Sequence, residues 1–141
     1  MREMKSSKLT KDEKVKAFDF LLTFANKIYH EYGKYDWEYK PLVKFCSDNK
    51  IKRKGSRKDK YGNFFWFDTK QHEVNGIKIN DMAHHFLRHI RNAVAHGNIR
   101  KESKMVIVDD YNTTPKQTMH GQLPIGLFWQ FLQLVQDSRK N

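Results

Sequence analysis

The stretch NDMAHHFLRHIRNAVAHG, residues 80–97, carries the clearest structural pattern in the chain. Its apolar residues recur at intervals of three and four, which places them on one face of an α-helix. Asn80 can cap the first turn, Asp81 suits the positive end of the helix dipole, and Gly97 supplies the left-handed residue that ends many helices. We therefore predict a helix from Asn80 to His96. Its expected buried stripe is Ile79, Met82, Ala83, Phe86, Ile90, Ala93 and Val94.

The segments on either side of this helix predict further helices and one β-hairpin. Helices are expected over Thr10–Tyr32, Trp37–Asn49 and about Pro124–Ser138. Strands over Lys104–Asp110 and Gln117–Gln122 are expected to form a hairpin. The predicted fold class is therefore mainly α, a helical bundle with a small β-hairpin before the C-terminal helix, in a single domain over residues 1–141. The stripe expected to face inward on the first helix is Val15, Phe18, Leu21, Leu22, Ala25, Ile28 and Tyr29.

The composition indicates a folded, strongly basic domain. Of the 141 residues 38% are hydrophobic, and 27 Lys and Arg against 16 Asp and Glu give a formal charge of +11. This excess of positive charge favours a polyanionic partner, although a generally basic surface is the plainer interpretation. No apolar run approaches the length needed to cross a bilayer, so no membrane association is expected. A single cysteine, Cys46, favours the reducing cytoplasm.

A basic loop over residues 50–60, KIKRKGSRKDK, is followed at once by the aromatic segment YGNFFWF, residues 61–67. Together they are interpreted either as an electrostatic funnel with a stacking platform for nucleic acid, or as a solvated charge run beside core aromatics. Arg88, on the outward arc of the helix over Asn80–His96, adds one more cation. The candidate RNA-binding residues are Lys52, Arg53, Lys54, Arg57, Lys58 and Arg88.

The end of the helix over Asn80–His96 gathers polar side chains on two flanks. On an ideal helix Arg91 and His96 diverge by about 140°, so they can act together only if Arg91 curls over the helix end or a second copy supplies the partner. Asn92 lies four residues before His96 and can hydrogen-bond its ring. Ala95 is small enough to let a second backbone approach. Two such helices around a two-fold axis would form one polar cleft.

The sequence of Arg91, Asn92 and His96 resembles the R-polar-x-x-x-H motif of the HEPN superfamily (higher eukaryotes and prokaryotes nucleotide-binding domains), and FLRHIRNAVAHGNI is similar to the motif helix of small stand-alone HEPN nucleases. The resemblance implies a homodimeric, metal-independent endoribonuclease that needs no cofactor, with Arg91, Asn92 and His96 as catalytic residues. The expected products are a 2′,3′-cyclic phosphate (or 3′-phosphate) and a 5′-OH.

The resemblance also implies a role in phage defence or as a toxin, with an antitoxin or another defence-system protein as a further partner. Some toxin members carry a Tyr two residues after the motif His, where a partner enzyme modifies it; this chain has Asn98 there. Some relatives bind RNA without cutting it, so a non-catalytic RNA-binding module is the alternative.

Two plainer interpretations compete with the nuclease. Arg91 and His96 can simply cap the helix and pair with surface acids. His85 and His89 have the i,i+4 spacing of paired zinc ligands, with His84 beside them. No cysteine or carboxylate accompanies these histidines in the sequence, so we expect no metal site.

Overall fold

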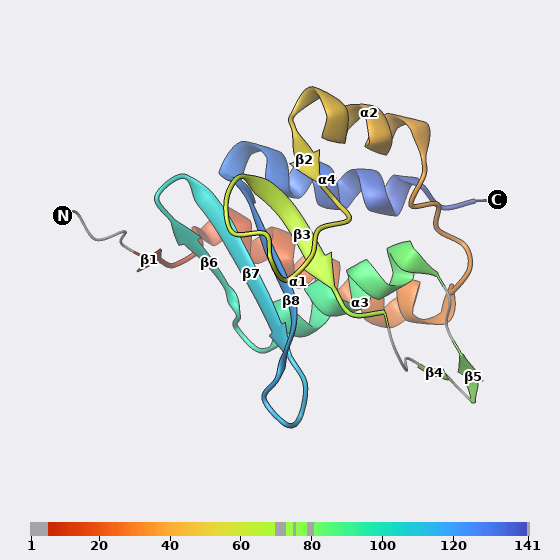
Figure 1. Ribbon diagram of the computed structural model, residues 1–141. Coiled ribbons are helices and arrows are strands. Elements are labelled where there is room, and N and C mark those ends of the chain that lie inside the picture. The colour runs from red at the N-terminus through yellow and green to blue at the C-terminus, as the bar shows by residue number, and fades with distance from the viewer. Residues whose placement is uncertain (1–5, 70–72, 75, 79–80, 141) are drawn as a thin grey trace.

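The computed structural model describes residues 6–69, 73–74, 76–78 and 81–140 (Figure 1). A six-stranded sheet forms its centre, in the order β1-β6-β7-β8-β3-β2. Its neighbours are antiparallel except for the parallel pair β2 and β3. A separate two-stranded ribbon pairs β4 with β5. The strands are β1 (Ser6–Ser7), β2 (Ile51–Lys52), β3 (Asn63–Phe67), β4 (Glu73–Val74), β5 (Ile77–Lys78), β6 (Ile99–Glu102), β7 (Met105–Tyr111) and β8 (Gln117–Pro124).

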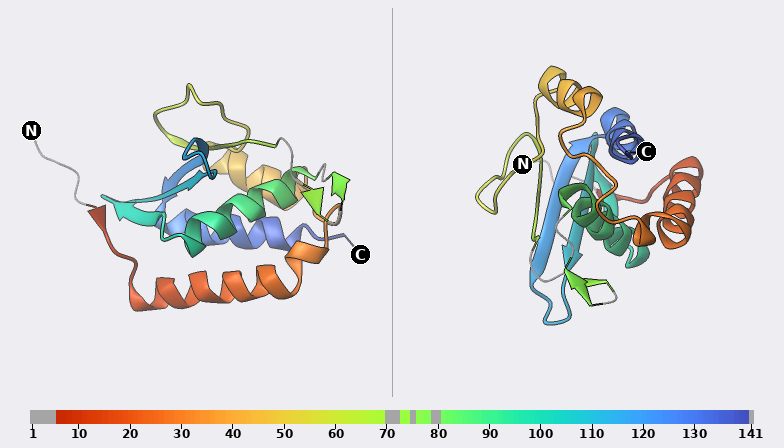
Figure 2. Two further views of the ribbon diagram at one scale, coloured as in Figure 1. Left: turned by 90° about the horizontal axis from the view of Figure 1, so that it is seen from below. Right: turned by 90° about the vertical axis from the view of Figure 1, so that its right-hand side faces the viewer.

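The helices cover one face of this sheet. In Figure 2, α3 and α4 lie against the sheet and α1 lies outside them, while the loop between β2 and β3 lies over the opposite face. The contacts between elements agree, because α3 and α4 both contact β7 whereas α1 packs mainly on α3. The helices are α1 (Lys11–Asn26), the 3-10 turn η1 (Ile28–His30), α2 (Lys40–Asp48), α3 (Met82–Ala95) and α4 (Ile125–Asp137).

The predicted mainly-α fold class is wrong, because the chain forms an α/β fold. The hairpin itself is present as β7 and β8, but these strands are the middle of a larger sheet. The aromatic segment forms β3 and pairs with β8, with Phe65 opposite Gly121. The residues just after α3 form β6 and pair with β7. Pairing between strands far apart in sequence depends on tertiary packing, which a local pattern does not reveal.

Helix α3 is close to the predicted helix, with its start shifted. Asp81 is the N-cap, and its carboxylate accepts from the backbone N–H of His84 at 3.3 Å. The predicted cap Asn80 and the stripe residue Ile79 lie outside the described residues. Met82, predicted to be buried, is 40% exposed. Gly97 has φ +73, so the chain leaves the helix through the left-handed conformation that glycine adopts without strain. The fully buried face comprises Ala83, Phe86, Leu87, Ile90 and Ala93.

Helix α1 begins as predicted but buries a different face. Thr10 and Glu13 form the expected capping box, with hydrogen bonds of 2.7 and 3.2 Å. The helix then turns Ala17, Phe20 and Phe24 inward. Much of the predicted stripe is instead exposed, including Val15 at 53%, Phe18 at 60% and Leu22 at 46%. Both sets have helical spacing, so periodicity alone could not choose between them.

An aromatic cluster joins α3 to the sheet. The ring of Phe86 lies 4.9 Å from that of Phe65, 5.3 Å from Trp37 and 5.4 Å from Phe131, in tilted and edge-to-face arrangements. Gly121 makes room for this cluster, because a Cβ there would lie 2.2 Å from the Phe65 ring. The cluster fixes α3 against the sheet, and with it the position of the motif residues at the end of α3. Among the described residues, none of the helices is long and apolar enough to cross a bilayer.

Candidate functional site

The motif residues lie at the solvent-facing end of α3, just before β6. Arg91 is exposed, and its Nη1 donates to Oδ1 of Asn92 at 3.0 Å. His96 caps the helix and is also exposed. Within the described part of the chain, no hydrogen bond or ion pair joins the side chain of His96 to Arg91 or Asn92. The structure therefore brings Arg91 and Asn92 together and leaves the His96 ring open to solvent.

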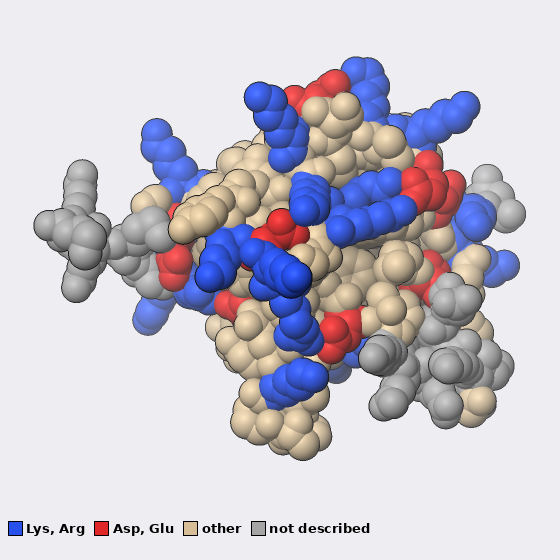
Figure 3. Space-filling view, viewed as in Figure 1, with Lys and Arg blue, Asp and Glu red and all other residues tan. Residues whose placement is uncertain are grey.

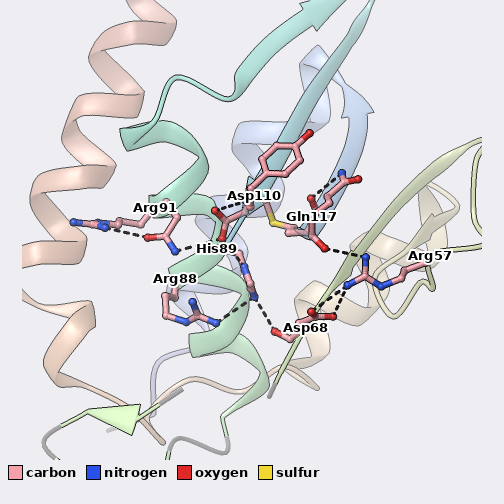
Figure 4. A network of polar contacts seen from close by, with 10 residues as sticks. Arg57, Asp68, Arg88, His89, Arg91, Asp110 and Gln117 are labelled. Atoms are coloured by element: carbon pink, nitrogen blue, oxygen red, sulfur yellow. Dashed lines mark hydrogen bonds and ion pairs between the residues drawn. The ribbon is translucent and has the colours of Figure 1, made fainter. Parts of the chain in front are cut away.

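Asn92 is held from behind by a buried acid on β7. Its Nδ2 donates to Oδ2 of Asp110 at 3.3 Å, and the same oxygen accepts from Nδ1 of His89 at 2.8 Å (Figure 4). The side chains of His89 and Asp110 are each only 2% exposed. Burial disfavours the charged carboxylate, yet the hydrogen bonds from His89 and Asn92 outweigh it and hold the pKa of Asp110 below its ordinary value. Asp110 thus orients the amide that contacts Arg91.

His89 extends this network toward the far end of β3. Its Nε2 lies 2.7 Å from the backbone carbonyl oxygen of Asp68. A carbonyl oxygen only accepts, so Nε2 donates to it, while Nδ1 faces the Asp110 carboxylate. The Asp68 side chain accepts from Arg57 at 3.1 Å (Figure 4). A continuous chain of contacts therefore runs from Arg91 to the basic loop.

The sequence did not indicate Asp110 as a site residue, and it indicated His89 only as a possible zinc ligand. One signal was present: Asp109 and Asp110 are consecutive in a strand, so their side chains point to opposite faces. One of them must face the helices, where a buried carboxylate needs a partner. With both ring nitrogens engaged, His89 is not free to bind zinc in this arrangement. The described residues contain no group of three or more His, Cys, Asp and Glu that could hold a metal ion.

Asp109 organises a second polar cluster on the other face of the sheet. Its carboxylate accepts from His120 Nδ1 at 2.6 Å, from Gln117 Nε2 at 2.7 Å and from Arg100 Nη1 at 2.9 Å. The hydrogen bond to Asp109 is the main cause that raises the pKa of His120, and it outweighs the effect of burial. This cluster is separated from Arg91 and His96 by the sheet and is assigned a structural role.

Most cations of the basic loop are paired with acids. Arg53 and Lys54 both contact Glu38 at 2.6 Å, Lys52 contacts Asp59 at 3.0 Å, and Arg57 contacts Asp68. Hydrogen bonds from Lys54 and Arg53 lower the pKa of Glu38. Lys58 is exposed and, among the described residues, has no ion pair.

Residues 50–60 contain seven cations, and among the described residues four of these pair with three acids, Asp59, Glu38 and Asp68. Seven positive charges against three negative ones leave a net charge of +4. In Figure 3, Lys and Arg side chains spread across this face with acids between them.

The aromatic segment belongs to the core rather than to an open platform. Phe64, Phe65 and Trp66 are 2%, 0% and 7% exposed. The guanidinium of Arg57 lies 4.3 Å from the centre of the Trp66 ring and covers it. Tyr61, 91% exposed, is the open ring of this segment. The core interpretation of these aromatics is therefore confirmed for β3.

The exposed end of α3 carries the sequence Arg91-Asn92-x-x-x-His96, the pattern that resembles the HEPN motif. A model of the family described as HEPN pEK499 p136 matches residues 15–141, so the chain belongs to this HEPN family. Neither the curated proteins nor the solved structures contain a match. Membership in a HEPN family indicates a nuclease or RNA-binding function.

Proposed function

We propose that this protein is a metal-independent endoribonuclease whose site is built from Arg91, Asn92 and His96. The observation that carries the proposal is that Arg91 and His96, whose spacing resembles the HEPN motif, are both exposed at the end of α3 in a chain of a HEPN family. Arg91 is further steadied by Asn92, which is itself anchored on the buried Asp110. A phosphate arriving at this surface would meet a preoriented guanidinium.

The chemistry needs only proton transfer and charge stabilisation, because RNA carries its own nucleophile, the 2′-OH. Attack of the 2′ oxygen on phosphorus forms the 2′,3′-cyclic phosphate and breaks the bond to the 5′ oxygen, which leaves as a 5′-OH once protonated. His96 either removes the 2′-OH proton or protonates the leaving oxygen. Arg91 neutralises the charge that develops on the phosphoryl oxygens.

The active unit in this proposal is a homodimer in which two α3 ends form one cleft. The exposed apolar residues of α1 support it, because Val15, Phe18 and Leu22 lie on the helix that packs against α3. Beside them a groove of about 340 Å³ continues to the end of α3 and the start of β6, near His96. Its apolar lining is Leu9, Ala17, Phe18, Leu21, Val94 and Ile99. A second copy would cover this apolar surface and bring its own Arg91 toward His96.

RNA is the proposed substrate, and the chain's formal charge of +11 supports it. The proposed setting is the cytoplasm, where the enzyme acts as a toxin or in phage defence, with an antitoxin or another defence-system protein as its partner.

The proposal is tested by incubating EDTA-treated protein with RNA and analysing the ends of the products. Cleavage that leaves cyclic phosphate and 5′-OH ends is expected, and His96→Ala should abolish cleavage while RNA binding persists. Gln133→Ala, at an exposed position on α4, is the matched control and should cut normally. If the wild-type protein binds RNA and leaves it intact, the chain is a non-catalytic RNA-binding module and the nuclease proposal is wrong.

A further inference from the structure

Arg88 is a largely buried cation that has no anionic partner among the described residues. It lies one helical turn before Arg91 on α3, and its Nε is buried without a hydrogen-bond partner in the described part of the chain. No carboxylate of the described residues lies within ion-pair distance of it. Burial is the main cause that lowers the pKa of Arg88, and the charge of Asp110 offsets this only in part. A guanidinium nevertheless stays charged in proteins, so its burial without an anion is costly.

The one polar contact that Arg88 makes with the described residues does not relieve this cost. Its Nη2 lies 3.2 Å from Nε2 of His89, but that nitrogen lies closer, at 2.7 Å, to the carbonyl oxygen of Asp68. Because Nε2 donates its hydrogen to the carbonyl, it has no lone pair left to accept from Arg88. Two donors therefore face each other, and the described residues offer the guanidinium no acceptor. Such an arrangement is explained if an anion binds there in use.

Arg88 opens into a cavity of about 450 Å³ between α1 and α3, within the size range of ligand pockets. The buried ring of Phe24 forms part of its wall, and Tyr29 stands at its edge with 39% of its surface exposed. Their rings meet edge to face at 6.3 Å, which steadies Tyr29. None of the described lining residues is acidic. The lining is Phe24, Ala25, Tyr29, Arg88, Arg91 and Asn92.

This cavity shares Arg91 and Asn92 with the motif, and His96 is not among its lining residues. We propose that it is a subsite for the nucleotide next to the cleaved bond: Arg88 binds the neighbouring phosphate and Tyr29 stacks on that nucleotide's base. The inference rests on the proposed function, since Arg91 must hold the scissile phosphate. Arg88 and Arg91, three residues apart on one helix face, are placed to contact successive phosphates.

The substrate class that fits is single-stranded RNA. A base must leave its stack to enter a recess between two helices, and a base paired in a duplex cannot do so. Stacking on an aromatic ring accepts any base, so the subsite is expected to select for strandedness more than for sequence.

The test measures binding of a short single-stranded RNA containing 2-aminopurine to the full chain in a His96→Ala background, where cleavage does not interfere. Tyr29→Leu should weaken binding about tenfold and remove the fluorescence quenching caused by stacking. Tyr29→Phe, which keeps the ring, should retain both. Arg88→Met should weaken binding similarly and reduce the slope of log affinity against log salt by about 0.7, the value for one phosphate contact on a single strand.

The urea midpoint of unfolding distinguishes an RNA-binding role of Arg88 from a structural role. Removing an unpaired buried charge should leave the urea midpoint of Arg88→Met unchanged or raised. A lowered midpoint with unchanged RNA binding would make Arg88 structural and overturn the proposal. So would adenosine monophosphate binding as tightly as the RNA, or Arg88→Met dissociating the dimer, since either result assigns the cavity to a different ligand.

The proposal that the protein is a nuclease and the proposal of this subsite can be refuted independently of each other. If wild-type protein does not cut RNA but the binding losses occur, the subsite stands as part of a binding module. If wild-type protein cuts RNA and both variants bind as before, the subsite is wrong and the nuclease stands.

Discussion

Replacing Asp110 with asparagine is expected to destabilise the folded chain and impair the motif together. The carboxylate accepts from His89 at 2.8 Å and from Asn92 at 3.3 Å, and its other oxygen accepts from the backbone N–H of Tyr111 at 2.9 Å. The His89 and Asp110 side chains are 2% exposed, so little solvent can replace the lost charge. Removing one partner of such a pair costs about 3–5 kcal/mol. Because asparagine keeps one acceptor oxygen, we expect about 3 kcal/mol.

A loss of this size is a large fraction of the stability of a typical domain, about 5–15 kcal/mol. It corresponds to a fall in the urea midpoint of about 1–2 M, which far-UV circular dichroism can follow. RNA cleavage should also fall in conditions where Asp110→Asn remains folded, because Asn92 loses the anchor that orients it toward Arg91. Asp48→Asn, at an exposed position on α2, is the matched control and should change neither property.

A double-mutant cycle tests whether the lost stability comes from the contact between His89 and Asp110. The combined change His89→Leu and Asp110→Leu removes both partners of the contact and leaves neither buried alone, so its cost should be smaller than the sum of the single costs. If Asp110→Asn lowers the free energy of unfolding by less than about 1 kcal/mol, or if the two changes are additive, the carboxylate is not the buried anchor that the geometry indicates.

Three further changes test other parts of the structure. Phe18→Asp on the exposed face of α1 should raise the dimer dissociation constant about tenfold or more in analytical ultracentrifugation, and Tyr61→Asp should not; equal behaviour of the two variants would place the interface elsewhere. Lys58→Ala should lower the salt slope of RNA binding by about 0.7, and an unchanged slope would show that this cation stays solvated. The raised pKa of His120 means that its bond to Asp109 stabilises the fold fully below about pH 6.5, with that stability lost as pH rises through the raised value. The urea midpoint should fall over that range in the wild type and stay flatter in Asp109→Asn; the same fall in both would contradict the assignment.

The sequence predicted those parts of the fold that depend on neighbours along the chain. Helix α3, the capping box of Thr10 and Glu13 and the β7–β8 hairpin are all set by local spacing and turn chemistry. The sheet could not be predicted in this way, since β3 joins β8 across more than fifty residues. The face of α1 was ambiguous because two sets of apolar residues share the helical period.

The candidate site, like the fold, could be predicted only where it depends on residues close together along the chain. The motif of Arg91, Asn92 and His96 is recognisable in the sequence, but its support is not, because Asp110 comes from a strand whose pairing was not foreseen. For the basic loop, the sequence left open an electrostatic funnel for nucleic acid or a solvated charge run, and it did not indicate which acids pair with the loop. Glu38 and Asp68, which pair with Arg53, Lys54 and Arg57, lie outside the loop and reach it only after folding.

The central claim, that Arg91 and His96 from different copies form one site, is tested most directly by mixing inactive variants. Arg91→Ala and His96→Ala proteins are unfolded together, refolded as mixed dimers and assayed for RNA cleavage. Half of randomly mixed dimers contain one of each chain, and in these one of the two composite sites is intact, so about one quarter of wild-type activity should return. Activity no greater than that of the separate variants, or undiminished specific activity of wild-type monomers on dilution, would contradict the account.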